Sequence, residues 1–281
     1  MGTQTQSRQV VSSISVLTRP GGTYILATPS LPASAQTVAR AIQLLRLVAS
    51  SQSRNLRLVD IADMAQLQKS TAHRLLQRLE EERMLVREIG KRGYRLGPLL
   101  YELGLAALPE TNLRELAHPA LQVLARATGD TAFLVVRSGF ESVCVERITG
   151  NFSIQTLTQG VGDRHPLGIG AGGLAILGAL SQADADIVLT AVRPLLRRYG
   201  LREQQLRERL AVTRVGGVAV DEGSAALDVT ALGRAVRDRR GAPIAAVFVP
   251  SIQTRMTDTR RSEVDKRLLA CVTSVESALP S

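Results

Sequence analysis

The chain has 281 residues, enough for one large domain or two ordinary ones, and 44% of them are hydrophobic. Its two cysteines and three histidines lie at unrelated positions, which argues against a disulfide framework or a zinc cluster, and we expect no cofactor. The formal net charge is +10, and residues 36–108, with 12 basic and 7 acidic side chains, hold half of that excess, as a nucleic-acid-binding region would. No apolar run approaches the ~20 residues of a membrane span and the N-terminus lacks a signal-like core, so we expect a cytoplasmic protein with no membrane partner.

Residues 1–35 are rich in Ser, Thr, Gln and Gly, and their apolar patch at residues 24–27 is too short to form a core. We therefore expect a mobile tail or, equally, the product of an overlong gene start. The first helix follows, ending before the Ser-rich residues 50–53, because apolar residues recur at helical spacing. These residues are Val38, Ala41, Ile42, Leu45 and Val48.

The next feature is a pair of short helices, predicted at residues 58–65 and 69–79 with a tight turn between them. Ala72, Leu75, Leu76 and Leu79 fall at i, i+3, i+4 and i+7, so one face of the second helix is apolar. The opposite face carries only hydrogen-bond donors and no carboxylate: Lys69, Ser70, Thr71, His73, Arg74, Gln77 and Arg78. This is the helix-turn-helix arrangement, whose second helix enters the DNA major groove.

A hairpin follows the second helix. Residues 84–89 and 94–96 read as strands around a turn at residues 90–93, with Lys91 and Arg92 at its tip, where they can contact a phosphate. A solvated charged face beside an ordinary hairpin is the alternative interpretation. The order of turn, donor face and basic wing favours DNA binding.

The remaining sequence predicts a second, mixed domain. Residues 98–106 form a linker helix with Pro98 in its first turn, and Asn112 caps another helix in which Pro119 should cause a kink or a restart. Strands are predicted at residues 131–136, 142–145, 152–157, 217–220, 232–237 and 244–249, and helices at 170–180, 183–193, 203–212 and 258–278. Strands, then helices, then strands indicate an α+β fold with a largely antiparallel sheet.

Residues 168–173 contain the glycine spacing G-x-G-x-x-G. A dinucleotide site requires a strand that leads directly into this motif, and residues 163–167 do not read as one, so we disfavour a nucleotide. Glycines at the start of a helix also allow close approach to its free N–H groups, which suit an anion such as a small carboxylate. Tight packing of the helix on a sheet is the alternative, and the glycines alone favour it.

Enzymatic function finds little support. The chain lacks the Gly-x-Ser-x-Gly, His-Glu-x-x-His and P-loop motifs. Glu141 and Glu146 with Asp163 are conceivable acid–base partners, but exposed carboxylates at strand edges are the commoner explanation. We therefore expect no catalysis.

The run LQKSTAHRLL at residues 67–76, followed by YRLG at residues 94–97, resembles the IclR (isocitrate lyase regulator) family of bacterial transcription factors, and the resemblance extends over about residues 35–278. It implies a winged helix-turn-helix domain at residues 36–97, a linker helix at 98–111 and a GAF-like effector-binding domain at 112–281. It also implies an effector pocket around the Gly-rich turn. Carried across, the pocket residues are Ile154, Leu157, Ala171, Gly172, Asp221, Ala231, Phe248 and Pro250.

Three of these positions depart from the pattern of relatives that bind small keto acids, which often have Cys and Ser there. Ala231, Phe248 and Pro250 are apolar, so we expect a larger effector, an aromatic or alkyl carboxylate. Asp221 should accept a hydrogen bond from an effector hydroxyl, or hold the Gly-rich turn in place.

The expected function is a homo-oligomeric regulator, a homodimer or a tetramer, that binds a double-stranded DNA operator and a small-molecule carboxylate effector. Ser70, Thr71, His73 and Arg74 should contact bases, and Lys69, Arg78, Lys91 and Arg92 phosphates. An architectural DNA-binding protein with a purely dimerising C-terminal domain is the main alternative. An enzyme whose GAF-like domain converts its ligand is a more remote one.

Overall fold

The computed structural model describes residues 13–19, 22–28, 33–49, 56–87, 93–106, 112–152, 156 and 158–280. The chain divides into two compact units, residues 1–99 and 100–281, and the boundary falls inside the helix α4 (Pro98–Ala106). None of the described helices combines the length and the apolar character that crossing a bilayer requires.

The first unit begins with a hairpin. β1 (Ser13–Arg19) and β2 (Gly22–Thr28) are antiparallel, with Ser13 opposite Thr28. No strands were predicted in this part of the sequence. Both stretches are rich in β-branched residues, which favour strands, and pairing satisfies backbone groups that an isolated patch would leave to water.

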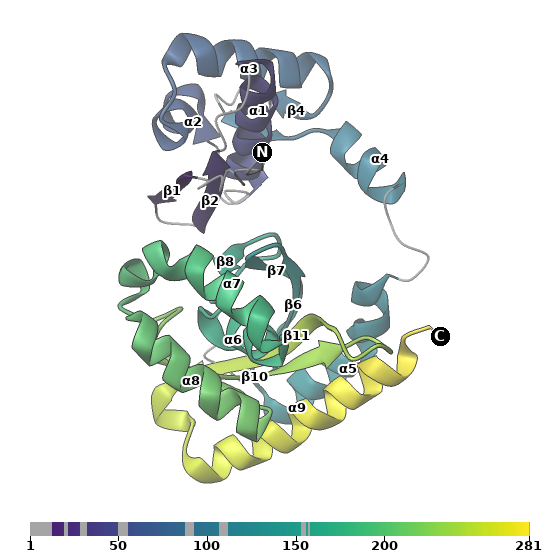
Figure 1. Ribbon diagram of the computed structural model, residues 1–281. Helices are drawn as coiled ribbons and strands as arrows, with labels where there is room; N and C mark the ends of the chain where they lie inside the picture. The colour runs from purple at the N-terminus through teal and green to yellow at the C-terminus, as the bar shows by residue number, and fades with distance from the viewer. Residues whose placement is uncertain are drawn as a thin grey trace, which may run out of the picture. The chain divides into compact units, whose positions relative to one another are not determined.

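The rest of the first unit is a winged helix-turn-helix (Figure 1). It comprises α1 (Ala33–Ala49), β3 (Leu56–Arg57), α2 (Leu58–Ala65), α3 (Lys69–Glu81), β4 (Leu85–Arg87) and β5 (Gly93–Leu96). The three strands pair in the order β3-β5-β4. A core that includes Leu44, Ile61, Leu76, Leu85 and Tyr94 joins all these elements. The predicted helices and hairpin are confirmed, whereas the wing tip with Lys91 and Arg92 lies outside the described residues.

The turn between α2 and α3 depends on a left-handed residue. Gln66 has φ 54°, and the next amide, that of Leu67, donates to Ala62 O over 3.0 Å. At the other end of α2, Asp60 accepts a hydrogen bond from the backbone N–H of Arg57 over 3.0 Å. The side-chain hydrogen bond from Arg57 lowers the pKa of Asp60. Both ends of α2 are therefore fixed, which sets the angle at which α3 leaves the turn.

In the second unit, α5 (Leu113–Thr128) leads into a six-stranded sheet. Asn112 caps α5 by accepting from Arg114 N over 3.2 Å, as predicted, and α5 continues through Pro119 without a restart. The strand order is β8-β7-β6-β11-β10-β9 and every pair is antiparallel. The strands are β6 (Ala132–Ser138), β7 (Glu141–Ile148), β8 (Arg164–Pro166), β9 (Ala219–Glu222), β10 (Val229–Arg237) and β11 (Pro243–Ile252). The strand predicted at residues 152–157 lies mostly outside the described residues.

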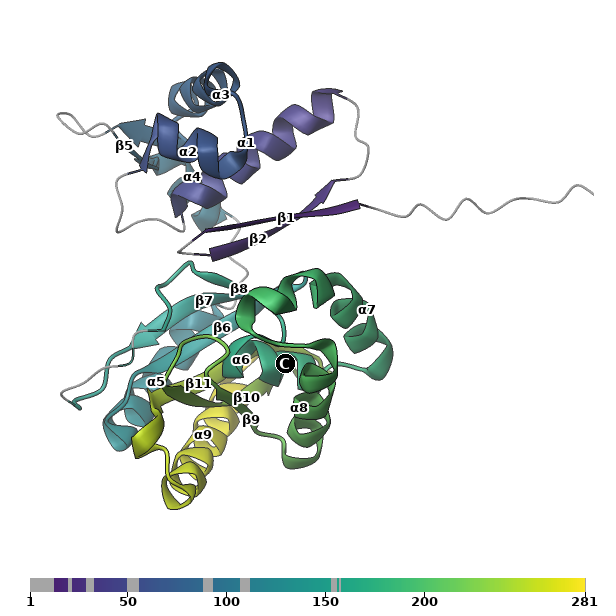
Figure 2. The same ribbon diagram turned by 90° about the vertical axis from the view of Figure 1, so that its left-hand side faces the viewer.

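Helices cover both faces of this sheet (Figure 2). α5 and α9 (Asp258–Ala278) pack side by side on one face and enclose the main core. α6 (Gly170–Ala179) packs on the other face, against β9, β10 and β11, and its residues 170–177 are all buried. α7 (Gln182–Val192), the 3-10 helix η1 (Arg193–Tyr199) and α8 (Glu203–Gly216) follow, and α8 packs against α6 and β9.

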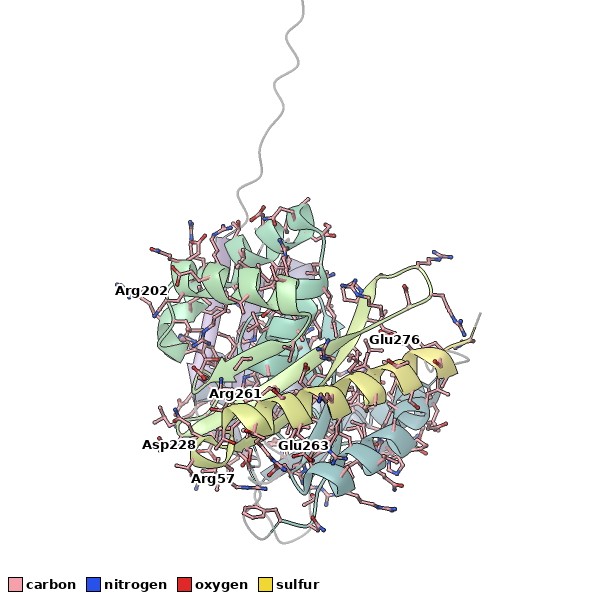
Figure 3. The ribbon with its side chains drawn as sticks, turned by 90° about the horizontal axis from the view of Figure 1, so that it is seen from below. Arg57, Arg202, Asp228, Arg261, Glu263 and Glu276 are labelled. Carbon is pink, nitrogen blue, oxygen red and sulfur yellow. The ribbon has the colours of Figure 1, made fainter. Side chains whose placement is uncertain are left out.

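An ion pair near one end of α9 and a hydrogen bond near the other connect this helix to the sheet (Figure 3). Arg261 pairs with Glu222 of β9 at 2.5 Å, and Glu276 accepts from the Arg237 amide of β10 at 2.7 Å.

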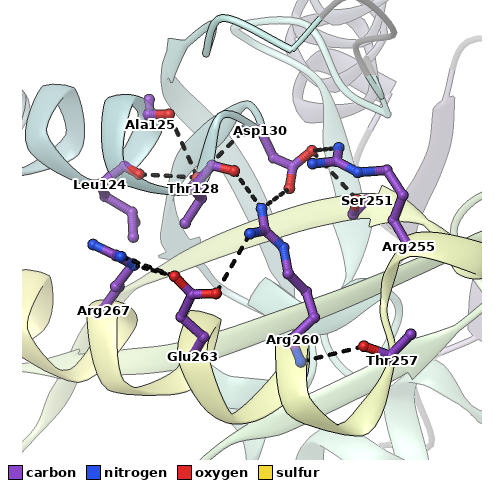
Figure 4. Close-up of polar contacts among 10 residues, drawn as sticks. All are labelled: Leu124, Ala125, Thr128, Asp130, Ser251, Arg255, Thr257, Arg260, Glu263 and Arg267. Carbon is purple, nitrogen blue, oxygen red and sulfur yellow. Dashed lines mark hydrogen bonds and ion pairs between the residues drawn. The ribbon is translucent and has the colours of Figure 1, made fainter.

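A buried carboxylate joins the end of α5 to the start of α9 (Figure 4). Asp130 pairs with Arg255 at 2.5 Å and with Arg260 at 3.1 Å, and it accepts from Ser251 at 3.3 Å. Arg255 also lies 3.4 Å above the ring of Phe152. One carboxylate thus connects the residue that follows α5 with residues 251–260, more than 120 positions later in the sequence.

Candidate DNA-binding and effector-binding sites

The predicted recognition helix presents its donors to solvent. On α3, Lys69, Ser70, His73 and Arg74 are exposed and Thr71 is half-buried, whereas Ala72 and Leu76 are fully buried. The residue before the helix, Gln68, forms no side-chain cap. The amides of the first turn therefore remain available to an outside acceptor such as a phosphate.

The C-terminal half of α3 differs from the expectation of a face without carboxylates. Gln77 donates to Glu81 at 3.2 Å, and Arg78 pairs with Glu81 at 3.1 Å and with Glu82 at 2.5 Å. Helical spacing of three and four residues brings these acids from the next turn. Such exposed pairs are weak, but Arg78 must leave them to meet a phosphate. The unpaired donors are concentrated at residues 69–74.

The strands of the wing are fixed to α3. Arg87 of β4 pairs with Glu80 at 3.1 Å and donates to the hydroxyl of Tyr94 at 2.6 Å. Burial raises the pKa of Tyr94, so its hydroxyl stays neutral. An ion pair therefore connects the base of the wing to α3, and a hydrogen bond joins its two strands.

A small cavity lies between the N-terminus of α6 and the sheet. It offers about 10 Å³ for the centre of a water molecule, which is room for roughly one water. Of the predicted effector residues, five line it: Ala171, Gly172, Asp221, Ala231 and Phe248. Pro250 is buried in β11 but does not line the cavity, and Ile154 and Leu157 lie outside the described residues.

Gly172 has a packing role. A Cβ at this position would lie 2.7 Å from Val135 Cγ2 and 2.9 Å from the Phe248 ring, so glycine lets α6 approach the sheet. The Phe248 ring stacks on Phe133 with centroids 4.8 Å apart, which leaves it little freedom to move. A larger side chain at residue 172 would therefore disturb this packing as well as the cavity.

Asp221 is connected to the start of α6. It is buried and accepts hydrogen bonds from Arg209 at 3.1 Å, from the Ala225 amide at 3.3 Å and from the Ser224 hydroxyl. The Ser224 hydroxyl in turn accepts from the Gly170 amide at 3.3 Å. Groups of the protein therefore already occupy both oxygens of the carboxylate.

Three polar residues of the lining were not anticipated from the sequence: Ser142, Thr158 and Gln159. Both Gln159 Oε1 and Thr158 Oγ1 are buried, and neither has a hydrogen-bond partner within the described part of the chain. No local pattern marks them, because strand pairing places Ser142 here, and residues 158–159 belong to an irregular segment before β8.

Two of the three suspected acid–base residues, Glu141 and Glu146, form ion pairs, and the third, Asp163, accepts a hydrogen bond from the Gly160 amide at 2.6 Å. Glu141 and Glu146 are buried, contrary to the expectation of exposed edge carboxylates, because Arg164 pairs with Glu141 at 2.9 Å and Arg114 with Glu146 at 2.8 Å. Burial raises the pKa of Glu146, but hydrogen bonds from Arg114 and His118 outweigh it, so the pKa is lowered.

The described residues contain no group of three or more His, Cys, Asp or Glu that would hold a metal ion. Burial raises the pKa of the Cys144 and Cys271 thiols to about 12, so neither is a ready nucleophile.

The Gly-rich motif is preceded by a strand after all, since β8 ends at Pro166, two residues before Gly168. This strand was not predicted because it has only three residues. It is an antiparallel edge strand, whereas a dinucleotide fingerprint requires the parallel strands of a βαβ unit. The Gly-rich motif therefore does not have the strand arrangement of a dinucleotide-binding site.

Comparison with known proteins covers both units. The IclR helix-turn-helix domain matches residues 37–88, and the bacterial transcriptional regulator IclR C-terminal domain matches residues 105–277. The chain is 27% identical to the transcriptional repressor IclR of Escherichia coli K12 over 265 residues, covering 90% of this chain and 93% of the relative. It is 30% identical to the regulator Rv1719 of Mycobacterium tuberculosis over 244 residues, with coverage of 86% and 92%.

Solved structures show the same fold. An IclR regulator from Alicyclobacillus acidocaldarius superposes with a TM-score of 0.70 at 23% identity, covering 86% of this chain and 98% of that one. An IclR homologue from Microbacterium hydrocarbonoxydans, complexed with 4-hydroxybenzoate, superposes with a TM-score of 0.68 at 23% identity and the same coverage. The domain matches span most of the chain, which therefore belongs to the IclR family of bacterial transcriptional regulators.

Proposed function

We propose that this regulator reads an operator with the N-terminal half of α3, and that a small organic carboxylate bound beside α6 modulates operator binding. The observation that carries the DNA part is the exposed donor face at residues 69–74 on a helix whose other face is buried. Ser70, Thr71, His73 and Arg74 contact base edges, whereas Lys69 and the wing residues Lys91 and Arg92 contact phosphates. Arg78 joins the phosphate contacts only after releasing Glu81 and Glu82.

The start of α6 supports a carboxylate. Among the described residues, none accepts a hydrogen bond from the Ala171 or Gly172 amide, and both residues line the cavity. Free amides at a helix N-terminus favour an anion. Val135, Ala231 and Phe248 offer apolar contacts to the body of such a ligand. A structural neighbour is complexed with 4-hydroxybenzoate, which has this chemistry.

The ligand has to open its site, because the cavity has room for about one water. Ligand binding and a change of conformation are therefore coupled, and the ligand stabilises the opened state by its differential affinity. This coupling is the basis on which the effector unit alters the placement of two DNA-binding heads.

We further propose that the chain is a homodimer, with a tetramer as a higher assembly. α1 exposes Val38 and Ile42, and α4 exposes Tyr101, Leu103 and Leu105, with Tyr101 70% exposed. Apolar residues on both helices indicate a self-complementary contact. The operator is then a pseudo-palindrome with half-sites about one helical turn, or a multiple, apart. Sedimentation at micromolar concentration should show a dimer or larger, and a monomer would contradict this assembly.

The test of the function starts from DNA selection. Genomic fragments are retained on the immobilised full-length protein, and the enriched site is titrated at several salt concentrations. Log affinity should fall linearly with log salt, because binding rests on phosphate contacts. Lys91→Ala should weaken all sequences alike. Failure to enrich any sequence over random fragments would overturn operator recognition.

The nearly closed cavity favours a second candidate, an architectural DNA-binding protein whose C-terminal unit only dimerises. A thermal-shift screen with aliphatic and aromatic carboxylates separates the two. The regulator should show at least one ligand that both raises the melting temperature and changes operator affinity, whereas the architectural protein shows none.

A further inference from the structure

Gln159 is an unusual member of the cavity lining. The residue is only 7% exposed, and its Oε1 atom has no hydrogen-bond partner among the residues that the structure describes. Buried side-chain amides are nearly always paired, since an unpaired one loses its water without compensation. The neighbouring Thr158 Oγ1 is also buried and unpartnered. The cavity lining therefore holds polar groups whose partner is not supplied by the described residues.

The other polar groups around the cavity are already engaged. Asp221 accepts from Arg209, Ser224 and the Ala225 amide, so three of the roughly four acceptor sites of its carboxylate are already used. Ser142 Oγ donates to His165 O at 3.4 Å. The described lining contains no Lys, Arg or His. The α6 amides and the pair Thr158 and Gln159 thus provide the remaining hydrogen-bonding capacity.

We infer that Gln159 recognises a hydroxyl group of the effector, so that this chain selects hydroxylated carboxylates. The inference rests on the proposed function, because the carboxylate is assigned to the amides of Ala171 and Gly172. It moves recognition of the hydroxyl from Asp221 to Gln159. Asp221 instead holds the start of α6 through Ser224 and Gly170.

A hydroxyl is a better partner for Gln159 and Thr158 than a charged group. A primary amide presents one oxygen acceptor and two N–H donors, and a hydroxyl both donates and accepts, so it suits either orientation of the amide. A second carboxylate here would be buried with Asp221, with no lining cation to offset it. A purely apolar group would leave Gln159 and Thr158 unpaired.

The test uses the full-length chain and two matched ligand pairs, 4-hydroxybenzoate with benzoate and lactate with propionate. Calorimetry should show that the hydroxylated member of one pair binds about tenfold tighter or more, because a site built for a hydroxyl rejects the analogue that lacks it. Gln159→Leu should abolish that preference and leave the affinity for the unhydroxylated member unchanged. The control is Gln204→Leu on the exposed surface of α8, which should keep the preference.

A second readout needs no ligand. Gln159→Leu replaces an unpaired buried amide by an apolar side chain of similar size, so the melting temperature of the free protein should rise by about 2–4 °C. A purely structural role for the amide predicts a fall instead, and a fall would overturn the inference.

The outcomes separate the inference from the proposed function. Equal binding of both members of a pair leaves the carboxylate effector standing and overturns the role of Gln159. Binding of none of the four probes overturns the effector class, and with it this inference, whatever the operator titration shows. A preference that persists in Gln159→Leu assigns the hydroxyl to another residue.

Discussion

The donor face of α3 comes from one short run, residues 69–74, whereas the cavity beside α6 is lined by residues as far apart as Val135 and Phe248. On α3, helical periodicity alone decides which side chains face solvent. In the cavity, the pairing of six strands and the packing of α6 on them determine which side chains form the lining. The comparison shows why a surface site can be read from local sequence, and why an enclosed site depends on the whole fold.

The charged groups of α3 and those near the cavity also differ in their surroundings. The donors at residues 69–74 are exposed and await a partner, whereas the carboxylates near the cavity, Asp221 and Glu141, are buried and paired with arginines. Substitutions at buried pairs should therefore affect stability, and substitutions on α3 should affect binding. The following changes test that division.

The largest effect is expected at Asp130. Asp130→Asn leaves Arg255 and Arg260 without their shared carboxylate, and breaking such a buried pair costs about 3–5 kcal/mol of unfolding free energy. Urea unfolding measures this loss. The matched control is Asp186→Asn, since Asp186 also pairs with an arginine, Arg207, but its side chain is 48% exposed against 4% for Asp130. The control should lose less than about 1 kcal/mol. Equal losses would refute the central position of Asp130 in the second unit.

A large effect on stability is also expected at Gly97, the residue that follows β5 of the wing. A Cβ at Gly97 would lie 2.1 Å from the carbonyl oxygen of Arg83, so Gly97→Ala forces backbone to move and should cost about 1–3 kcal/mol. Gly104 has no atom within 4 Å of its Cβ position and lies in the helix α4. Gly104→Ala should therefore stabilise by about 0.5–1 kcal/mol. Thermal unfolding of both variants shows the contrast, and a tolerated Gly97→Ala would argue against the close packing at this corner.

Features that local sequence determines were predicted correctly, whereas features that depend on residues far away in the sequence were not. The helices of the first unit and the bounds of α9 follow from apolar periodicity, and Asn112 was identified as a cap by its residue type. The burial of Glu141 and Glu146 was missed because their arginine partners lie on β8 and α5, 23 and 32 residues away. The hairpin β1–β2 was missed because pairing, rather than the short apolar patch, stabilises it.

The cavity was predicted only in part. Resemblance to a family placed Ala171 and Gly172 at it, because their position in the Gly-rich turn is marked in the sequence. Gln159 carries no such mark, since an isolated Gln in an irregular segment has no periodicity and becomes notable only when it is buried without a partner. The acids that engage Arg78 lie one turn beyond the donor run, which explains why that face looked free of carboxylates.

A smaller effect is expected from acid at Glu146. Its pKa is lowered in the folded protein from an ordinary value of 4.5, so its contribution to stability is present above that pH and is lost as the pH falls through the folded value. Glu146→Gln should therefore flatten the decline in unfolding free energy below pH 4.5. Urea unfolding from pH 7 to pH 3 follows this slope. A parallel decline in both proteins would assign the acid sensitivity elsewhere.

The smallest effect is expected at the helix-turn-helix corner. Gln66 adopts φ 54°, a conformation that costs a residue with a side chain about 1–2 kcal/mol and costs glycine little. Gln66→Gly should therefore stabilise by about 0.5–1 kcal/mol after the entropy of glycine is included, and operator affinity should not change. Combined thermal unfolding and operator titration tests both statements. Loss of affinity without loss of stability would give Gln66 a direct role at the DNA.

The central claim, that α3 reads DNA through its N-terminal half, is tested most directly by titrating the selected operator and its single-base variants with Arg74→Ala and Arg78→Ala. Arg74→Ala should cost about 1–3 kcal/mol and relax the preference at one base pair. Arg78→Ala should cost less than about 1 kcal/mol and leave base preference intact, because Arg78 is engaged with Glu81 and Glu82. Unchanged binding by Arg74→Ala, or an equal or larger loss with changed base preference in Arg78→Ala, would contradict the account.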